Sequence, residues 1–136
     1  MLSNLQKYKG IAWLPVCLWY GLITYLSHQD SDTLSQFSWL PWDKFSHFIA
    51  YFILGILLLL PYEWRMRSFW KLLSMFGLGL LLSSLDEWHQ SFIPGREASG
   101  ADILADMIGF GLALVVGFHK IGLFINRLWQ KVRFYS

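Results

Sequence analysis

The chain has 136 residues, of which 55% are hydrophobic and 18% aromatic, while only 15% are charged. An ordinary soluble domain carries about 25% charged residues, and one of this size would have to expose large apolar patches. The net charge of +2 gives no indication of nucleic-acid binding, and a single cysteine excludes a disulfide framework within one chain. Composition therefore indicates an integral membrane protein that forms one domain.

Four apolar segments follow one another along the chain, at about residues 10–27, 45–62, 69–88 and 101–118. Each is near the length that a helix needs to cross about 30 Å of hydrocarbon. Lipid cannot satisfy backbone hydrogen bonds, so such segments are expected to be helical. We therefore predict an all-α fold, an integral membrane bundle of four transmembrane helices.

The basic residues are distributed unevenly between the connections. Nine of the eleven Lys and Arg residues lie before the first segment, around the turn between the second and third, or after the fourth, and the two exceptions are Lys44 and Arg96. The positive-inside rule then predicts a multi-pass membrane protein with both termini cytoplasmic. Residues 119–136 alternate apolar and basic residues, which predicts a C-terminal amphipathic interfacial helix that forms a basic cytoplasmic tail.

The uncharged part of three segments is short. It covers residues 48–60, 72–85 and 107–118, which at about 1.5 Å per residue span only about 18–21 Å. The ionisable residues at the outer ends of these segments must therefore sit below the membrane surface, at a similar depth. Such residues usually face a bundle interior and pair with one another. We therefore predict a polar site within the outer leaflet, built from segments two to four and the connection 89–101.

Helical spacing places the polar residues on one face of each segment. The three faces carry Asp43, His47 and Tyr51; Asp86 and Gln90, with Ser83 and Glu87 beside them; and Asp102, Asp106 and Gly109. On the fourth segment, small residues at 105, 109, 113 and 117 would let another helix approach closely. Close packing would bring the three polar faces together.

This set of residues fits several kinds of chemistry. In an enzyme, closely spaced carboxylates divide into acid and base roles, His47 shuttles protons, and Arg96 binds a phosphate or carboxylate of the substrate. In a binding or transport component, the residues capture a polar head group or relay protons. A divalent cation held by His47 or His89 with carboxylates is weakly indicated, because no ligand spacing is diagnostic. A hydrogen-bonded latch that only locks the bundle is the remaining alternative.

Two stretches carry a resemblance to a known family. "DKFSHFIAYFILG" (43–55) and "DEWHQSFIPGREASGADILADMIG" (86–109) resemble the two signatures of the VanZ-like membrane proteins. The resemblance covers about residues 40–117 and implies a single VanZ-like membrane domain over 1–136. The family is named for a protein that lowers susceptibility to teicoplanin, which implies a protein of a bacterial cytoplasmic or inner membrane with a function in the cell envelope. Position 106 is often Asn in relatives, which favours a hydrogen-bonding role for Asp106. The other matching positions are Asp43, Lys44, His47, Tyr51, Glu87, Gln90, Pro94, Gly95, Arg96, Asp102 and Gly109.

From these patterns we expect a protein that acts on or binds a lipid or lipid-linked cell-envelope molecule. Its expected partners are membrane lipids or a lipid-linked envelope precursor and no nucleic acid. Whether it is an enzyme and whether it oligomerises stay open, and we predict no cofactor and no metal ligand. The candidate catalytic residues are His47, Asp86, Glu87 and Asp106, and the candidate substrate-binding residues are Asp43, Lys44, Tyr51, Gln90, Arg96 and Asp102.

Overall fold

The computed structural model describes residues 10–29, 43–61 and 69–117, and its regular structure is helical throughout these ranges. The elements are η1 (Ile11–Trp13), α2 (Leu14–Ser27), α4 (Asp43–Leu58), α5 (Phe69–Gln90) and α6 (Gly100–Val116). The predicted all-α fold is therefore confirmed for the described ranges. The amphipathic tail predicted for 119–136 lies outside them.

Two prolines explain where α2 begins and where α4 ends. Pro15 lies in the first turn of α2, where its missing N–H would have no partner within the helix. Helix α4 ends at Leu58, before the expected end of the second segment at residue 62. Pro61 follows, and the residue before a proline is disfavoured in helical conformation. Residues 59 and 60 close the helix with short-range turns.

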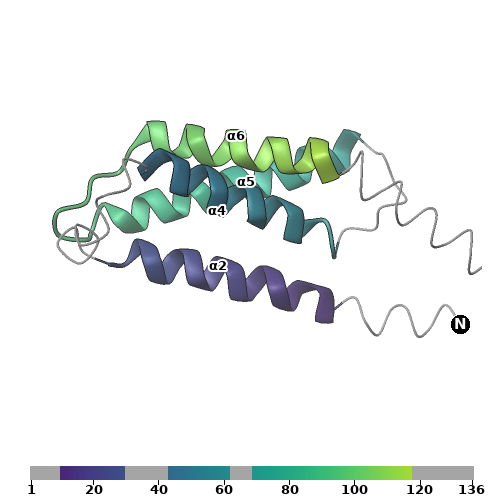
Figure 1. The fold of residues 1–136 in the computed structure, drawn as a ribbon, viewed down its shortest axis with the longest axis horizontal. Helices are drawn as coiled ribbons and strands as arrows, with labels where there is room; N and C mark the ends of the chain where they lie inside the picture. The colour runs from purple at the N-terminus through teal and green to yellow at the C-terminus, as the bar shows by residue number, and fades with distance from the viewer. Residues whose placement is uncertain (1–9, 30–42, 62–68, 118–136) are drawn as a thin grey trace, which may run out of the picture.

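The four long helices lie side by side, and successive helices run in opposite directions (Figure 1). The last turns of α2 and α5 therefore lie at the same end of the bundle as the first turns of α4 and α6. Two hydrogen bonds from side chains of α2 to backbone carbonyl oxygens tie this helix to its neighbours. Trp19 Nε1 donates to the carbonyl oxygen of Ala50 at 2.9 Å, and the Tyr20 hydroxyl donates to that of Leu82 at 3.2 Å.

Helices α4 and α6 run in parallel and approach one another at small residues. A Cβ atom added at Gly109 would collide with the backbone carbonyl oxygen of Phe48. One added at Gly55 would lie 2.7 Å from Cβ of Ala113 and 3.1 Å from the carbonyl oxygen of Phe110. The small-residue positions predicted on the fourth segment thus do allow a close helix contact, and the partner is α4.

Hydrophobic side chains cover the outside of the bundle, whereas polar side chains are buried. Leu18 is 66% exposed, Leu104 61% and Val115 68%, although all three are strongly apolar. The buried side chains, by contrast, include four carboxylates and a histidine. A soluble protein rarely exposes so much contiguous apolar surface, whereas lipid contact requires it. This distribution indicates a membrane protein.

The prediction of four membrane spans is confirmed only in part. Among the described helices, α5 alone is long and apolar enough to cross a membrane by length and composition. Its 22 residues extend about 33 Å, whereas the 16 residues of α4 and the 17 of α6 extend about 24 and 26 Å. The shorter helices fall below a typical hydrocarbon thickness of about 30 Å.

Candidate functional site

Polar side chains from all four long helices meet at one end of the bundle. Ser27 ends α2, Lys44 and His47 lie in the first turns of α4, and residues 83–90 form the last two turns of α5. Asp102 and Asp106 lie in the first two turns of α6. Helical periodicity turns these residues inward, where Ser27, His47, Ser83, Asp86, Glu87, Gln90, Asp102 and Asp106 are all buried.

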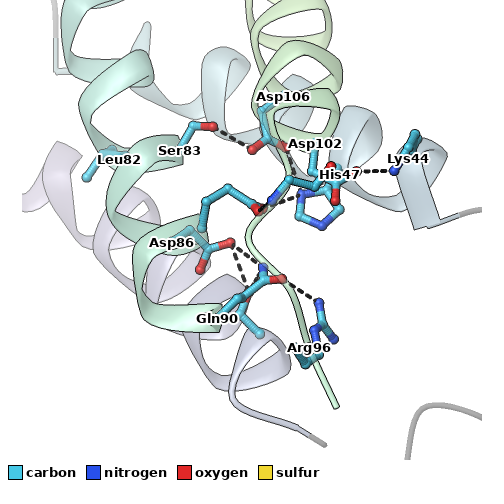
Figure 2. Close-up of polar contacts among 12 residues, drawn as sticks. Lys44, His47, Leu82, Ser83, Asp86, Gln90, Arg96, Asp102 and Asp106 are labelled. Atoms are coloured by element: carbon cyan, nitrogen blue, oxygen red, sulfur yellow. Dashed lines mark hydrogen bonds and ion pairs between the residues drawn. The ribbon is translucent and has the colours of Figure 1, made fainter. Parts of the chain in front are cut away.

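The first of two groups, which we call the His47 cluster, consists of His47, Ser83, Glu87 and Asp106. His47 Nδ1 lies 3.1 Å from Oδ1 of Asp106, a hydrogen bond in which the imidazole is the donor when Asp106 is ionised. The Ser83 hydroxyl donates to Oδ2 of Asp106 at 2.7 Å. Asp106 is fully buried and has both carboxylate oxygens bonded (Figure 2).

Glu87 belongs to the same cluster, but only one of its two carboxylate oxygens has a hydrogen-bond partner. Its Oε2 accepts the backbone N–H of Ser99 at 2.7 Å, which fixes the start of α6 against α5. A carboxylate at the N-terminus of a helix is favoured by the helix dipole. Its Oε1 is 3.9 Å from His47 Nδ1 and has no hydrogen-bond partner although it is buried. A buried polar atom without a partner carries a desolvation penalty of about 1–3 kcal/mol, so it calls for an explanation.

An ion pair lies beside the His47 cluster, at its border with the exterior. Lys44 Nζ donates to Oδ1 of Asp102 at 2.7 Å, with the Lys44 side chain 57% exposed and that of Asp102 only 6%. Asp102 also lies in the first turn of α6, where a negative charge is favourable.

The second group, the Gln90 cluster, consists of Ser27, Asp86, Gln90 and Arg96. Oδ2 of Asp86 accepts from the Ser27 hydroxyl at 2.9 Å and from Nε2 of Gln90 at 3.2 Å. Arg96 in turn donates from Nη2 to Oε1 of Gln90 at 2.8 Å. This chain of bonds connects α2, α5 and the connection that leads to α6, and Figure 2 shows it beside the His47 cluster.

The two clusters contain more negative charge than the structure compensates. Within the described ranges, neither Lys nor Arg forms an ion pair with Asp86, Glu87 or Asp106. Arg96 is bound to an amide oxygen, and Lys44 to Asp102. The site is therefore suited to a cationic ligand, or to protonation of one or more carboxyls.

Comparison with protein-family models matches residues 12–125 to VanZ/LLP1. The chain belongs to the VanZ/LLP1 family. Comparisons with curated proteins and with solved structures give no match, so membership depends on the family model, which covers most of the chain. The resemblance seen in the two motifs is thereby confirmed. Family membership and the apolar helix α5 together suggest a membrane protein.

The structure places the remaining predicted site residues of this VanZ/LLP1 protein differently. Asp43 is the first residue of α4, and its side chain lies outside the described part of the chain. Tyr51 is fully buried one turn beyond His47, and its hydroxyl has no hydrogen-bond partner. His89 does not join the carboxylates, because its Nε2 lies 3.1 Å from Nδ1 of His28, the residue that follows α2, in an exposed pair.

Sequence reasoning did not assign Ser27 to the site. The sequence predicts a site built from segments two to four and the connection 89–101, without the first segment. One feature of the sequence could have identified Ser27: it is a hydroxyl residue at the outer end of a predicted span, at the same depth as the carboxylates. Ser83 and the backbone N–H of Ser99 likewise bind site carboxylates without having been assigned a role.

Ser27 gives a direct test of the Gln90 cluster. Ser27→Ala removes the hydroxyl that donates to the Asp86 carboxylate, so we expect a loss of about 1.5–3 kcal/mol in the free energy of unfolding. Unfolding of the detergent-solubilised protein by SDS would measure it. Ser74→Ala is the matched control, since that exposed hydroxyl bonds only within its own helix and should change stability by less than about 0.5 kcal/mol. Equal stability of the two variants would contradict a structural role for Ser27.

Proposed function

We propose that this VanZ/LLP1 protein is a four-pass membrane protein that binds, and acts on, the polar head group of a lipid or lipid-linked cell-envelope molecule. The proposal includes cytoplasmic termini and a site in the outer leaflet, as the distribution of Lys and Arg suggests. One observation carries it. A buried cluster of ionisable side chains from three helices lies at one end of a bundle whose exterior is apolar. Such residues within membrane helices are rare and usually functional.

The two clusters would have different parts in this function. In the His47 cluster, an imidazole hydrogen-bonded to a buried carboxylate is the arrangement of a general base with an orienting partner. Glu87 offers a second carboxylate oxygen toward the same imidazole. The head group would therefore react or bind against this cluster, with His47, Glu87 and Asp106 as candidate catalytic residues.

Lys44 and Arg96 would recognise an anionic part of the head group. The Arg96 guanidinium has five N–H donors, and the contact to Gln90 is its one hydrogen bond among the described residues. A guanidinium with spare donors suits a phosphate, which it can bind through two parallel bonds. Lys44, at the exposed border of the site, adds a second positive charge. A phosphate-bearing head group placed between them would face the His47 cluster.

A purely structural role is the alternative that a specific observation favours. In the Gln90 cluster, hydrogen bonds connect three parts of the bundle without a gap, as expected of a latch. Each cluster contains one buried carboxylate oxygen without a hydrogen-bond partner, Asp86 Oδ1 and Glu87 Oε1. The His47 cluster differs because, among the described residues, Glu87 is the one of these two acids that has an imidazole nitrogen and a second carboxylate oxygen within 4.8 Å. We therefore assign the latch role to the Gln90 cluster and the ligand-binding role to the His47 cluster.

Lipid analysis of a deletion strain tests the function. Loss of the gene should change the amount of at least one lipid or lipid-linked envelope precursor, measured by mass spectrometry, and should alter teicoplanin susceptibility if that precursor limits cell-wall assembly. The parent protein should restore the wild-type profile, and Glu87→Gln, expressed at an equal level, should not.

Glu97→Gln is the matched control, since it makes the same chemical change at an exposed position in the connection between α5 and α6. It should restore the profile fully. An unchanged lipid profile in the deletion strain, or full complementation by Glu87→Gln, would refute the proposal.

A further inference from the structure

His47, Glu87 and Asp106 offer one imidazole nitrogen and two carboxylate oxygens that all lie within 4.8 Å of one another. All three side chains are buried, and each comes from a different helix. Imidazole nitrogen together with carboxylate oxygen is a ligand set that divalent transition-metal ions use. We propose that these three residues form a binding site for one such ion, of which Mn²⁺ and Zn²⁺ suit the mixed nitrogen and oxygen ligands.

The separations between the ligand atoms agree with a shared ion. Ligands about 2.0–2.2 Å from a metal lie roughly 3.0–3.6 Å apart in octahedral or tetrahedral sites. His47 Nδ1 and Asp106 Oδ1 are 3.1 Å apart, within that range. His47 Nδ1 and Glu87 Oε1 are 3.9 Å apart, and the three ligand atoms lie within 4.8 Å of one another, so the Glu87 side chain would move inward when the ion binds. The ion would take the place of the proton that His47 shares with Asp106.

The unpartnered oxygen of Glu87 points independently to a ligand. Its carboxylate is held from behind by the Ser99 N–H on Oε2, so that Oε1 is the atom directed toward His47. That atom is buried and makes no hydrogen bond. Buried polar atoms are nearly always satisfied in native proteins, and an unobserved ion is one of the recognised reasons for an exception.

Charge favours the same conclusion. No Lys or Arg in the described ranges pairs with Glu87 or Asp106, because Lys44 is held by Asp102 and Arg96 by Gln90. Two carboxylates and a neutral imidazole would carry two negative charges, which a divalent ion balances. Burial of such a group without compensation is strongly unfavourable.

This inference departs from the expectation drawn from the sequence, in which no metal ligand was assigned. Metal motifs are recognised by ligands at fixed short spacing on one element, such as two histidines on one helical turn. Here the ligands at 47, 87 and 106 are brought together by the packing of α4, α5 and α6. The ion would also supply positive charge where a phosphate-bearing head group faces acidic residues, and this last step rests on the proposed function.

Metal titration of the purified full-length protein tests the site. The chain would be solubilised in detergent, freed of metal with a chelator and titrated with Mn²⁺ followed by electron paramagnetic resonance, with Zn²⁺ as competitor. We expect about one Mn²⁺ per chain, displaced by Zn²⁺. Glu87→Gln and His47→Ala should each weaken binding at least a hundredfold, whereas Glu97→Gln should bind as the parent does. Circular dichroism and gel filtration would establish that each variant is folded.

The outcomes separate this inference from the proposed function. Absence of stoichiometric binding of either ion to the parent, or binding that folded Glu87→Gln leaves unchanged, overturns the metal site. If that happens while the deletion strain still shows an altered lipid profile, the proposed function survives without the metal. If the ion binds as expected and no lipid changes, the metal site stands and the lipid function falls.

Discussion

Replacement of Gly109 by alanine should destabilise the protein by about 3 kcal/mol, at the upper end of what an added methyl group does in a packed core. The new Cβ would collide with the backbone carbonyl oxygen of Phe48, which cannot rotate away as a side chain can. Helices α4 and α6 would have to separate. Because Phe48 follows His47 and Gly109 is one turn beyond Asp106, separation would also lengthen the contact between His47 and Asp106. SDS-induced unfolding in detergent measures the first effect, and Mn²⁺ affinity the second.

Gly111→Ala is the control for this prediction, since it adds the same methyl group to the same helix. A Cβ at Gly111 would lie 3.6 Å from a ring atom of Phe76, an ordinary van der Waals distance. This variant should match or slightly exceed the stability of the parent, because alanine is a better helix former than glycine. Similar stabilities of the two variants would show that the contact at Gly109 does not hold α4 against α6.

The part of this structure that follows from sequence is the part set by helical periodicity. Residues 83, 86, 87 and 90 lie within two turns and must share a broad face, and an apolar environment gives that face reason to turn inward. The same holds for Asp102 and Asp106. The sequence therefore predicts which side chains gather, and their common depth follows from the short uncharged stretches.

The pairing between helices could not be predicted, because periodicity says nothing of rotation or axial shift between helices. Nothing in the spacing distinguishes Asp86 from Glu87 as the partner of His47, yet one carboxylate faces α2 and the other faces α4. Ser27 was missed for the same reason. The early end of α4 depends on Pro61. The segment stays apolar up to residue 62, so its hydropathy alone predicts a longer helix.

The two neighbouring carboxylates on α5 illustrate how one helix can serve two purposes. Asp86 is bound by the Ser27 hydroxyl and the Gln90 amide, both neutral groups that lose their partner if the acid is removed. Glu87, one residue later, is turned about 100° around the helix axis and directs one oxygen toward an imidazole without a bond. Structural and ligand-binding roles can therefore be separated by substitution at adjacent positions.

We expect Glu87→Gln to be more stable than the parent without metal and less stable than the parent with metal. In chelator, the variant should be more stable than the parent by about 1–2 kcal/mol, because it removes a buried charge that has no cationic partner, while the amide oxygen can still accept the Ser99 N–H. With Mn²⁺ at about one hundred times the dissociation constant, the parent should gain about 2.7 kcal/mol and the variant almost nothing. The parent should then be the more stable protein. Unfolding by SDS in detergent, with and without Mn²⁺, measures both differences.

Asp86→Asn is the neighbouring comparison, because it neutralises a carboxylate of the Gln90 cluster and leaves the proposed ligands intact. It should weaken the bonds to Ser27 and Gln90 and lower stability in chelator, yet keep the full gain from Mn²⁺. If Glu87 were part of a latch, Glu87→Gln would be less stable than the parent in chelator. Breaking a latch destabilises the protein whether or not metal is present. Loss of stability in Glu87→Gln under both conditions would therefore assign Glu87 to the latch and leave the His47 cluster without its ligand-binding carboxylate.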